Sequence, residues 1–225
     1  MDDIKLSICS TDIGLVLYDA ESDSAAVSVT HSREALTVTN SRIRCAHVDG
    51  IGIEAKNCQK VTVENCTLSV QGDGLDRKLS TSQAVVLKEV KVATVRGCQL
   101  SGFRVGVSSC DSQLLELSDT TVAECSVGVW LKKEEEEAEQ LKVNWSDCRV
   151  ANSFYGALVE SSQCELTARK ISFFNVLRKL LKLKVRKSTK SYLMYIAEAK
   201  RSVCWSFVGK LDRYHTIFRC LKTFF

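Results

Sequence analysis

Hydrophobic and polar positions alternate in short runs along the first 168 residues of this 225-residue chain. Strictly alternating runs, such as Val-Thr-Val-Glu at 61–64, recur at 36–39, 93–96, 115–118 and 141–144. A second kind of run has glycine between two apolar residues, at 51–53, 105–107 and 127–129, with variants at 84–86 and 156–158. A period of two carried mainly by valine and threonine predicts short β-strands rather than helices.

Each alternating run is followed by a turn and a third short strand, at 40–43, 65–68, 97–100, 119–122 and 147–150. Equivalent turn positions, from Ser41 through Cys66, Cys98 and Thr120 to Cys148, are 25, 32, 22 and 28 residues apart. A base period of 22 residues fits every step if the polar segments at 71–83 and 132–140 are inserted loops. Three strands in each period describe one coil of a parallel β-helix. The predicted fold is therefore all-β, a parallel β-helix (solenoid) of about six coils.

A leucine-rich repeat has an overlapping period and is the competing fold. Its Leu-x-x-Leu-x-Leu signature is missing, and leucine does not dominate the repeats. Proline is absent from the whole chain, which suits continuous strand pairing. We therefore favour the β-helix.

The repeat also explains many of the eleven cysteines. Cys66, Cys98 and Cys148 fall in one register, where Ser41 and Thr120 replace them in other coils. A second register is predicted to contain Cys58, Cys110 and Cys164. Small, weakly polar side chains stacked at an inward turn fill a tight corner, and a buried free thiol behaves much like a small hydrophobic group. The cysteines are therefore interpreted as structural thiols rather than disulfides or metal ligands.

Two segments carry a resemblance to a known superfamily: Val-Thr-Val-Glu-Asn-Cys-Thr-Leu at 61–68 and Ala-Thr-Val-Arg-Gly-Cys-Gln-Leu at 93–100. Through them the chain resembles the right-handed β-helix repeat superfamily over residues 14–170. That superfamily includes pectate-lyase-like enzymes and also non-catalytic intracellular proteins, namely the β-helix F-box proteins and the Shc-binding protein family. The cysteine-rich coils look closer to the second group. The resemblance then implies a cytoskeletal or spindle role, or substrate recognition in a ubiquitin ligase, although no F-box is recognisable.

The charge distribution separates a body from a tail. From Arg169 onward there are 15 Lys and Arg against two acidic residues, whereas the preceding 168 residues hold 16 basic and 25 acidic ones. We therefore divide the chain into a β-helix at 1–168 and a basic, aromatic-rich tail at 169–225, with an amphipathic helix predicted near 171–187. Three interpretations of the tail stay open: a cap on the last coil, a surface for an anionic membrane or an acidic protein, and a non-native extension.

Catalytic constellations are hard to assemble from this sequence. A lyase or glycosidase of this shape needs acids gathered on one outer face. The candidate acids fall at scattered registers and are interpreted as solvated surface: Asp73, Asp76, Asp111, Glu116, Asp119 and Glu124. His31, His47 and His215 show no metal-ligand spacing, and the acidic run at 134–137 is interpreted as a solvated loop. We expect no catalytic, cofactor-binding or metal-binding residues and no cofactor.

These observations predict a non-enzymatic β-helix scaffold for protein–protein interaction, whose protein partner is unidentified. Plausible contacts are Lys88, Lys91, Arg96 and Arg104, with the loops at 71–83 and 132–140. The alternative is a polysaccharide lyase or glycosidase-like enzyme, or a degenerate relative of one; acids converging on one face would favour it. No secretory signal is visible, so the expected compartment is the cytoplasm, or else the nucleus or the cytoskeleton.

Overall fold

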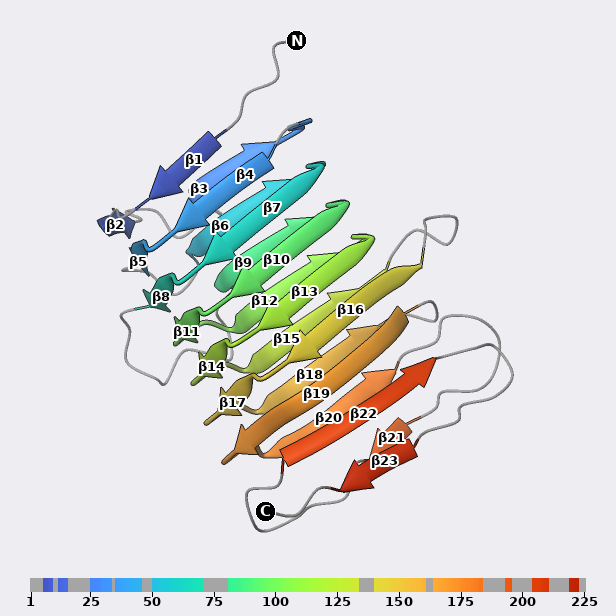
Figure 1. The fold of residues 1–225 in the computed structure, drawn as a ribbon. Helices are drawn as coiled ribbons and strands as arrows, with labels where there is room; N and C mark the ends of the chain where they lie inside the picture. The colour runs from blue at the N-terminus through green and yellow to red at the C-terminus, as the bar shows by residue number, and fades with distance from the viewer. Residues whose placement is uncertain are drawn as a thin grey trace.

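The structure is a computed structural model of the chain, and it is a parallel β-solenoid of about five turns (Figure 1). It describes residues 25–33, 35–45, 50–70, 81–133, 140–160 and 164–177 in full. For the strands before and after these residues it describes the backbone alone. The described residues contain no helix, so nothing among them could cross a membrane as a helix.

Each turn has three strands, and equivalent strands of successive turns pair in parallel to form three stacks. The front stack, facing the viewer in Figure 1, contains β1 (Leu6–Cys9), β4 (Ala35–Thr39), β7 (Lys60–Glu64), β10 (Val92–Arg96), β13 (Leu114–Ser118), β16 (Leu141–Ser146) and the first part of β19 (Cys164–Phe174). The side stack contains β2 (Asp12–Leu15), β5 (Arg42–Cys45), β8 (Thr67–Val70), β11 (Gln99–Ser101), β14 (Thr121–Ala123), β17 (Arg149–Ala151) and the end of β19.

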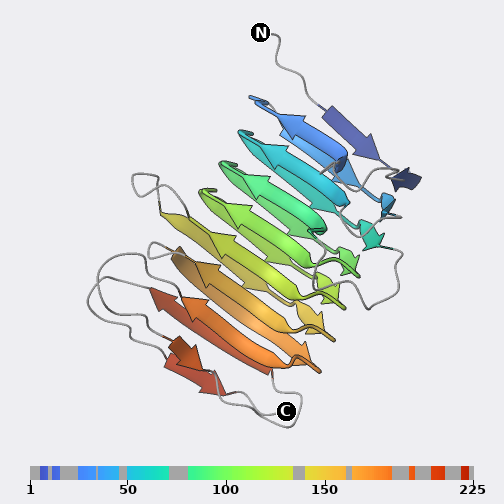
Figure 2. The ribbon, with the colours of Figure 1, turned by 180° about the vertical axis from the view of Figure 1, so that it is seen from behind.

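The back stack lies behind the other two and faces the viewer in Figure 2. It contains β3 (Ala25–Thr30), β6 (Ile51–Lys56), β9 (Gln83–Lys88), β12 (Val105–Cys110), β15 (Val127–Lys132), β18 (Tyr155–Glu160) and β20 (Arg178–Leu183). The three-strand repeat predicted from the sequence is confirmed by this order, and so are the variant strands at 84–86 and 156–158. Five complete sets of strands run from β3 to β17; a sixth coil stays a prediction.

The core is the interior of the solenoid, filled by one face of every strand. In the front stack Val63 stands opposite Val38 and Val95 of the neighbouring turns, and all three side chains are fully buried. Towards the end of the solenoid the same column changes to Leu117 and then to Trp145. The indole of Trp145 meets the ring of Phe173 edge-on, with 6.0 Å between ring centroids. Like side chains stacked at the strand spacing thus provide one continuous hydrophobic core.

Sharp turns separate the front stack from the side stack, and each needs a residue in the left-handed region. Six such residues, with φ between 49° and 63°, occupy equivalent positions: Asn40, Asn65, Gly97, Asp119, Asp147 and Lys170. Glycine, asparagine and aspartate tolerate this conformation best, which explains their recurrence here. The turn residue redirects the chain within one step, so the next side chain points into the core.

The predicted amphipathic helix near 171–187 is wrong over the part that the structure describes. Residues 171–174 finish β19, and residues 178–183 form β20, which pairs in parallel with β18. The apolar residues of this segment are also compatible with one more layer of strands. Pairing of those strands supplies hydrogen-bond partners for the backbone N–H and C=O groups at the edges of β17 and β18. The predicted division at 168/169 falls within the continuous strand β19. Residues 184–187 lie outside the described residues.

Antiparallel strands follow the last parallel rung. β22 (Cys204–Lys210) pairs with β19, β23 (Arg219–Lys222) pairs with β22, and β21 (Leu193–Tyr195) pairs with β20. These pairings place β22 along β19 and β21 along β20, at the end of the solenoid (Figure 1). The capping interpretation stays a prediction.

Candidate functional site

The acidic residues that were singled out in the sequence and that the structure describes do not converge. One coil carries four of them, at different positions around its circumference: Asp111, Glu116, Asp119 and Glu124. Asp111 lies in the turn after β12, Glu116 on the outer face of β13, and the other two in the turns after β13 and β14. Asp73, Asp76 and the run at 134–137 lie outside the described residues. Such dispersal does not match the clustered acids that a glycosidase-like site requires.

The predicted basic contacts are equally spread around a coil. Lys88 ends β9 in the back stack, Lys91 is exposed in the next turn, and Arg96 ends β10 in the front stack. Arg104 lies at the corner between the side and back stacks. Arg96 forms an exposed ion pair with Asp119, Nε to Oδ2 3.8 Å. The structure therefore does not bring these four side chains into one site.

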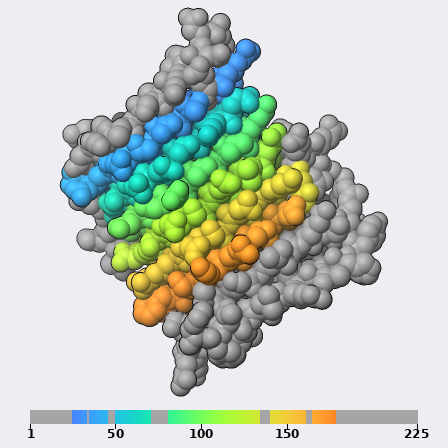
Figure 3. All heavy atoms as spheres, viewed as in Figure 1, coloured from blue at the N-terminus to red at the C-terminus, as the bar shows by residue number. Residues whose placement is uncertain are grey.

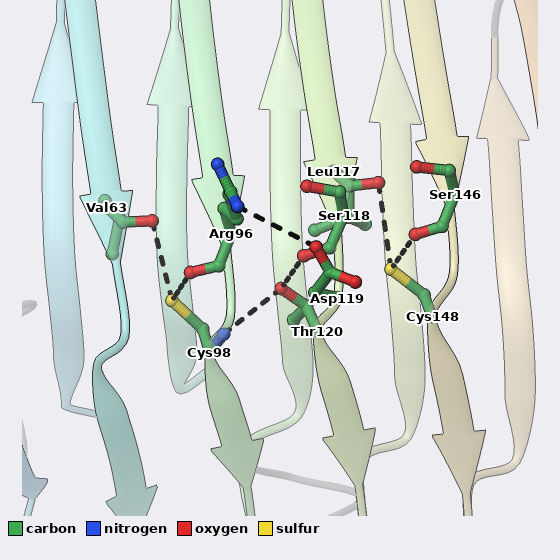
Figure 4. A network of polar contacts seen from close by, with 9 residues as sticks. All are labelled: Val63, Arg96, Cys98, Leu117, Ser118, Asp119, Thr120, Ser146 and Cys148. Carbon is green, nitrogen blue, oxygen red and sulfur yellow. Dashed lines mark hydrogen bonds and ion pairs between the residues drawn. The ribbon is translucent and has the colours of Figure 1, made fainter.

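The predicted column of small turn residues is confirmed, and its members share one hydrogen-bonding arrangement (Figure 4). Each side chain donates to the carbonyl oxygen two residues earlier: Cys66 to Glu64 at 3.2 Å, Cys98 to Arg96 at 3.2 Å, Cys148 to Ser146 at 3.1 Å, Ser41 to Thr39 at 2.8 Å and Thr120 to Ser118 at 2.8 Å. The three thiols also reach a carbonyl oxygen of the preceding coil, at 3.5–3.7 Å. The column thus stabilises the turns between coils.

The second predicted cysteine register is wrong for Cys110 and Cys164. Cys110 is the last residue of β12 and stands between Lys88 and Lys132 on the outer face, while Cys164 stands opposite Leu141. The residue equivalent to Cys58 in the coil of Cys110 is Ser112, two positions later. Lining up the coils by cysteine therefore displaced Cys110 by two residues across the left-handed turn at Asp111, where an outward position is followed by an inward one. Cys164 is displaced by one residue.

The buried thiols have the properties of structural groups. Burial is the main cause that raises the pKa of Cys148 to about 11 and that of Cys45 also to about 11. A hydrogen bond between the thiols of Cys66 and Cys98 lowers the pKa of Cys66 and raises that of Cys98. Both side chains are about 1% exposed, so a reagent cannot reach either sulfur in the folded chain. Among the described residues no three His, Cys, Asp or Glu side chains are placed to hold a metal.

On the outer face of the back stack, apolar and basic side chains lie in adjacent rows. The first row crosses six strands in register and consists of Ser28, Glu54, Val86, Ser108, Trp130 and Leu158. The second row lies two residues further along each strand and consists of Thr30, Lys56, Lys88, Cys110, Lys132 and Glu160. We call these two rows the back face.

The two ends of the back face differ chemically. At the β3–β6 end the carboxylate of Glu54 is neutralised by Lys56, Nζ to Oε1 2.7 Å, and accepts a hydrogen bond from Ser28 at 3.2 Å. From β9 to β18 the first row contains no charge, and Trp130 is its largest side chain. The ammonium of Lys132 lies 5.9 Å from the centre of the Trp130 ring, a cation–π arrangement. This half of the face can therefore bury apolar surface while its lysines remain beside it.

The outer face of the front stack is more polar, and Figure 3 shows its coils as parallel bands. Its central row consists of Thr37, Thr62, Thr94, Glu116, Asn144 and Thr167. Neighbouring side chains of this row can form hydrogen bonds with each other. The hydroxyl of Thr94, for example, donates to the carboxylate of Glu116 at 3.4 Å. The apolar contribution is restricted to the neighbouring row, where Val92 and Leu114 are half-buried.

Sequence reasoning missed Trp130, although a signal was present. Residues 127, 129 and 131 of β15 point inward, so alternation places Trp130 on the outside. The pattern does not show which other side chains share its face, because Val86 and Leu158 lie 44 and 28 residues away along the chain. Only the register between coils brings the three into one row.

Comparison with known proteins gives one positive result. A family model described as a right-handed β-helix region matches residues 25–175, about two thirds of the chain. No curated protein and no solved structure gives a match.

Proposed function

Because the chain belongs to the right-handed β-helix family, we propose that it is a non-enzymatic scaffold that binds a protein partner across its back face. The observation that carries this proposal is the unbroken register that aligns Val86, Trp130 and Leu158 beside the row of Lys88 and Lys132. The fold alone would not decide the function, because enzymes and binding proteins share it.

The composition of the back face suits a protein interface. Tryptophan is strongly enriched among the residues that contribute most to binding. Trp130 has Leu158 beside it on one side and Ser108 on the other, with Val86 one strand beyond Ser108. Lysines beside an apolar row favour a partner whose surface combines apolar side chains with acidic ones, because complementary charges select the partner and orient it. Stacked coils also provide a rigid face, so little conformational freedom is lost on binding.

The distribution of carboxylates gives further support to a scaffold over the lyase or glycosidase alternative. Asp111, Glu116, Asp119 and Glu124 point to different sides of the rod, whereas acid–base cleavage of a polysaccharide needs its acids around one substrate. An assay for unsaturated uronate product with Ca²⁺ present tests the alternative directly. Product that increases with protein concentration would overturn the scaffold proposal.

Lysine cross-linking can test whether the partner binds the back face, because the outer faces of the back stack and of the front stack both carry lysines. Full-length chain is captured with its bound proteins, treated with an amine-specific cross-linker and mapped by mass spectrometry. Cross-links to the partner are expected at Lys88 and Lys132, whereas Lys60 and Lys142 of the front stack act as internal controls. Cross-links mainly at Lys60 and Lys142 would contradict the assignment of the face.

A pair of matched variants completes the test. Trp130→Ser removes the central side chain of the back face, whereas Leu114→Ser removes an outward, half-buried apolar side chain of the front stack. A residue at the centre of an interface typically contributes about 2 kcal/mol or more, so Trp130→Ser should weaken binding by roughly 30-fold or more. Leu114→Ser should bind as the unchanged chain does, and thermal melting checks that both variants are folded.

The resemblance extends this proposal to a compartment and a subtype. We place the scaffold in the cytoplasm, nucleus or cytoskeleton, because the described cysteines are free thiols, the state that a reducing compartment maintains. A role like that of the β-helix F-box proteins or the Shc-binding family follows from the resemblance of the cysteine-bearing coils. Imaging of the tagged chain through cell division would test it; exclusive location in secretory compartments would contradict it.

A further inference from the structure

Three large apolar side chains are exposed among the described residues, and all three lie at one corner of the last coils. Phe154 is 38% exposed, Phe174 51% and Leu177 66%. We call them the apolar corner. Phe174 and Leu177 fall in the segment at 171–187 that was predicted to be an amphipathic helix. None of the three belongs to the back face.

The register explains why they come together. Tyr155 pairs with Arg178, so the residues immediately before them, Phe154 and Leu177, are neighbours in adjacent coils. The backbone N–H of Leu177 accordingly donates to the carbonyl oxygen of Ser153 at 3.1 Å. Phe174 is the last residue of β19 and pairs with Ala151. It precedes Leu177 by three residues. Residues 174–177 therefore wrap around the corner formed by residues 151–154.

One described cation lies at this corner, and the sequence that follows the corner is basic. The guanidinium of Arg149 lies over the ring of Phe174, 5.4 Å from the ring centre. The residues that follow Leu177 read Arg-Lys-Leu-Leu-Lys-Leu and form β20. Neither residues 148–159 nor residues 166–183 contain an aspartate or glutamate. Exposed apolar side chains thus lie in a segment whose charged residues are all basic.

We propose that the apolar corner docks the chain onto an anionic lipid bilayer. Phenylalanine and leucine next to arginine and lysine are the residue types that bind at the membrane interface, where apolar side chains enter the acyl boundary and cations face the headgroups. The three side chains are exposed and the guanidinium of Arg149 lies beside Phe174, so apolar and cationic groups can meet the membrane interface together. The proposal is independent of the scaffold function assigned to the back face.

The test is co-sedimentation of the full chain with vesicles of two compositions, phosphatidylcholine alone and phosphatidylcholine mixed with phosphatidylserine. We expect binding to the second kind, little binding to the first, and weaker binding as salt is raised. The double variant Phe174→Ser/Leu177→Ser should lower the partition coefficient about tenfold or more. Val92→Ser/Leu114→Ser, which removes two apolar side chains from the front stack, is the matched control and should bind normally.

Two further measurements keep the outcome unambiguous. Thermal melting shows whether each variant is folded, and Phe174→Trp reports contact with lipid without removing the aromatic group, through quenching of its fluorescence by brominated lipids. Absence of binding by the unchanged chain would overturn the proposal. Equal binding by the unchanged chain and by the double variant Phe174→Ser/Leu177→Ser would overturn it as well. Binding to polyglutamate that depends on the corner, without binding to vesicles, would assign the corner to an acidic protein instead and also overturn it.

Discussion

The backbone N–H of Cys98 donates to the side-chain hydroxyl of Thr120 in the next coil, with 3.3 Å between nitrogen and oxygen. The same hydroxyl donates to the carbonyl oxygen of Ser118 at 2.8 Å (Figure 4). One small polar side chain thus satisfies two backbone groups from two coils. This relationship explains why serine, threonine and cysteine recur in the column of turn residues; in the last coil the buried Ile171 takes this position.

Thr120→Val should therefore destabilise the solenoid although it keeps the shape of the side chain. It removes the hydroxyl to which the backbone N–H of Cys98 donates, whereas the carbonyl oxygen of Ser118 keeps its bond from the N–H of Gly97. We expect the free energy of unfolding to fall by about 1–3 kcal/mol. Thr120→Ser keeps the hydroxyl and should lose less. Urea denaturation of both variants measures the difference; equal stabilities would show that the hydroxyl contributes nothing.

A methyl group at Gly128 should be poorly tolerated. A Cβ built there would lie 2.5 Å from the carbonyl oxygen of Gly156 and 2.9 Å from a methyl carbon of Val150. The first contact is with backbone of the paired coil, which cannot move without breaking the ladder. We expect Gly128→Ala to lower stability by about 1–3 kcal/mol in denaturant titration.

The control for Gly128→Ala is Ala123→Gly, which alters a side chain on the outer face of the neighbouring coil. It should cost about 1 kcal/mol or less, the ordinary effect of glycine in a strand. If the two variants were equally stable, the close approach at Gly128 would have no energetic consequence.

Ser109 offers a stabilising substitution. Its side chain is fully buried between Leu87 and Leu131 of the adjacent coils, and its hydroxyl has no hydrogen-bond partner among the described residues. Since an unsatisfied buried hydroxyl typically costs about 1–3 kcal/mol, Ser109→Ala should raise stability by about 1 kcal/mol or more. Thermal melting checks this, with the outward Ser108→Ala as a near-neutral control. A loss of stability would show that the hydroxyl has a partner.

Stability should fall at alkaline pH because of buried thiols. Burial raises the pKa of Cys45 and Cys148 from 9.0 to about 11. Between these values the unfolded chain loses thiol protons that the folded chain retains, so the free energy of unfolding decreases as pH rises from about 9 to about 11. Below pH 9 both states are protonated and these thiols cause no pH dependence.

Cys148→Thr isolates this effect, because threonine occupies the same column at Thr120. Urea titrations at several alkaline pH values should show a shallower decline for the variant than for the unchanged chain. Parallel declines would mean that Cys148 ionises equally easily in both states, contrary to its burial.

Much of the fold could be predicted because each coil repeats the same local constraints. Alternation of Val61 and Val63 with polar residues marks a strand, and left-handed residues such as Asn65 mark the turn that follows. The inward column of Cys66, Cys98 and Cys148 follows from the same count. The prediction failed for Cys110 because aligning the coils by residue type did not locate the left-handed turn at Asp111, which separates this outward residue from the inward Ser112.

The end of the solenoid could not be predicted in this way. Residues 171–183 carry apolar positions that fit a helix as well as a strand, and local sequence does not distinguish the two. The open edges of β17 and β18 decide the outcome, because pairing with them satisfies backbone groups that a helix would leave exposed.

The amino-acid sequence by itself determined the repeating unit: three strands, a small residue at each inward turn and a stacked hydrophobic interior. These properties depend on neighbours within one coil. Only the tertiary structure decided which outward side chains share a surface, such as Val86 with Trp130 or Phe154 with Leu177. The physical reason is that loops of unequal length separate the coils, so the distance along the chain alone does not fix which outward residues become neighbours. Backbone hydrogen bonds between the coils impose that register.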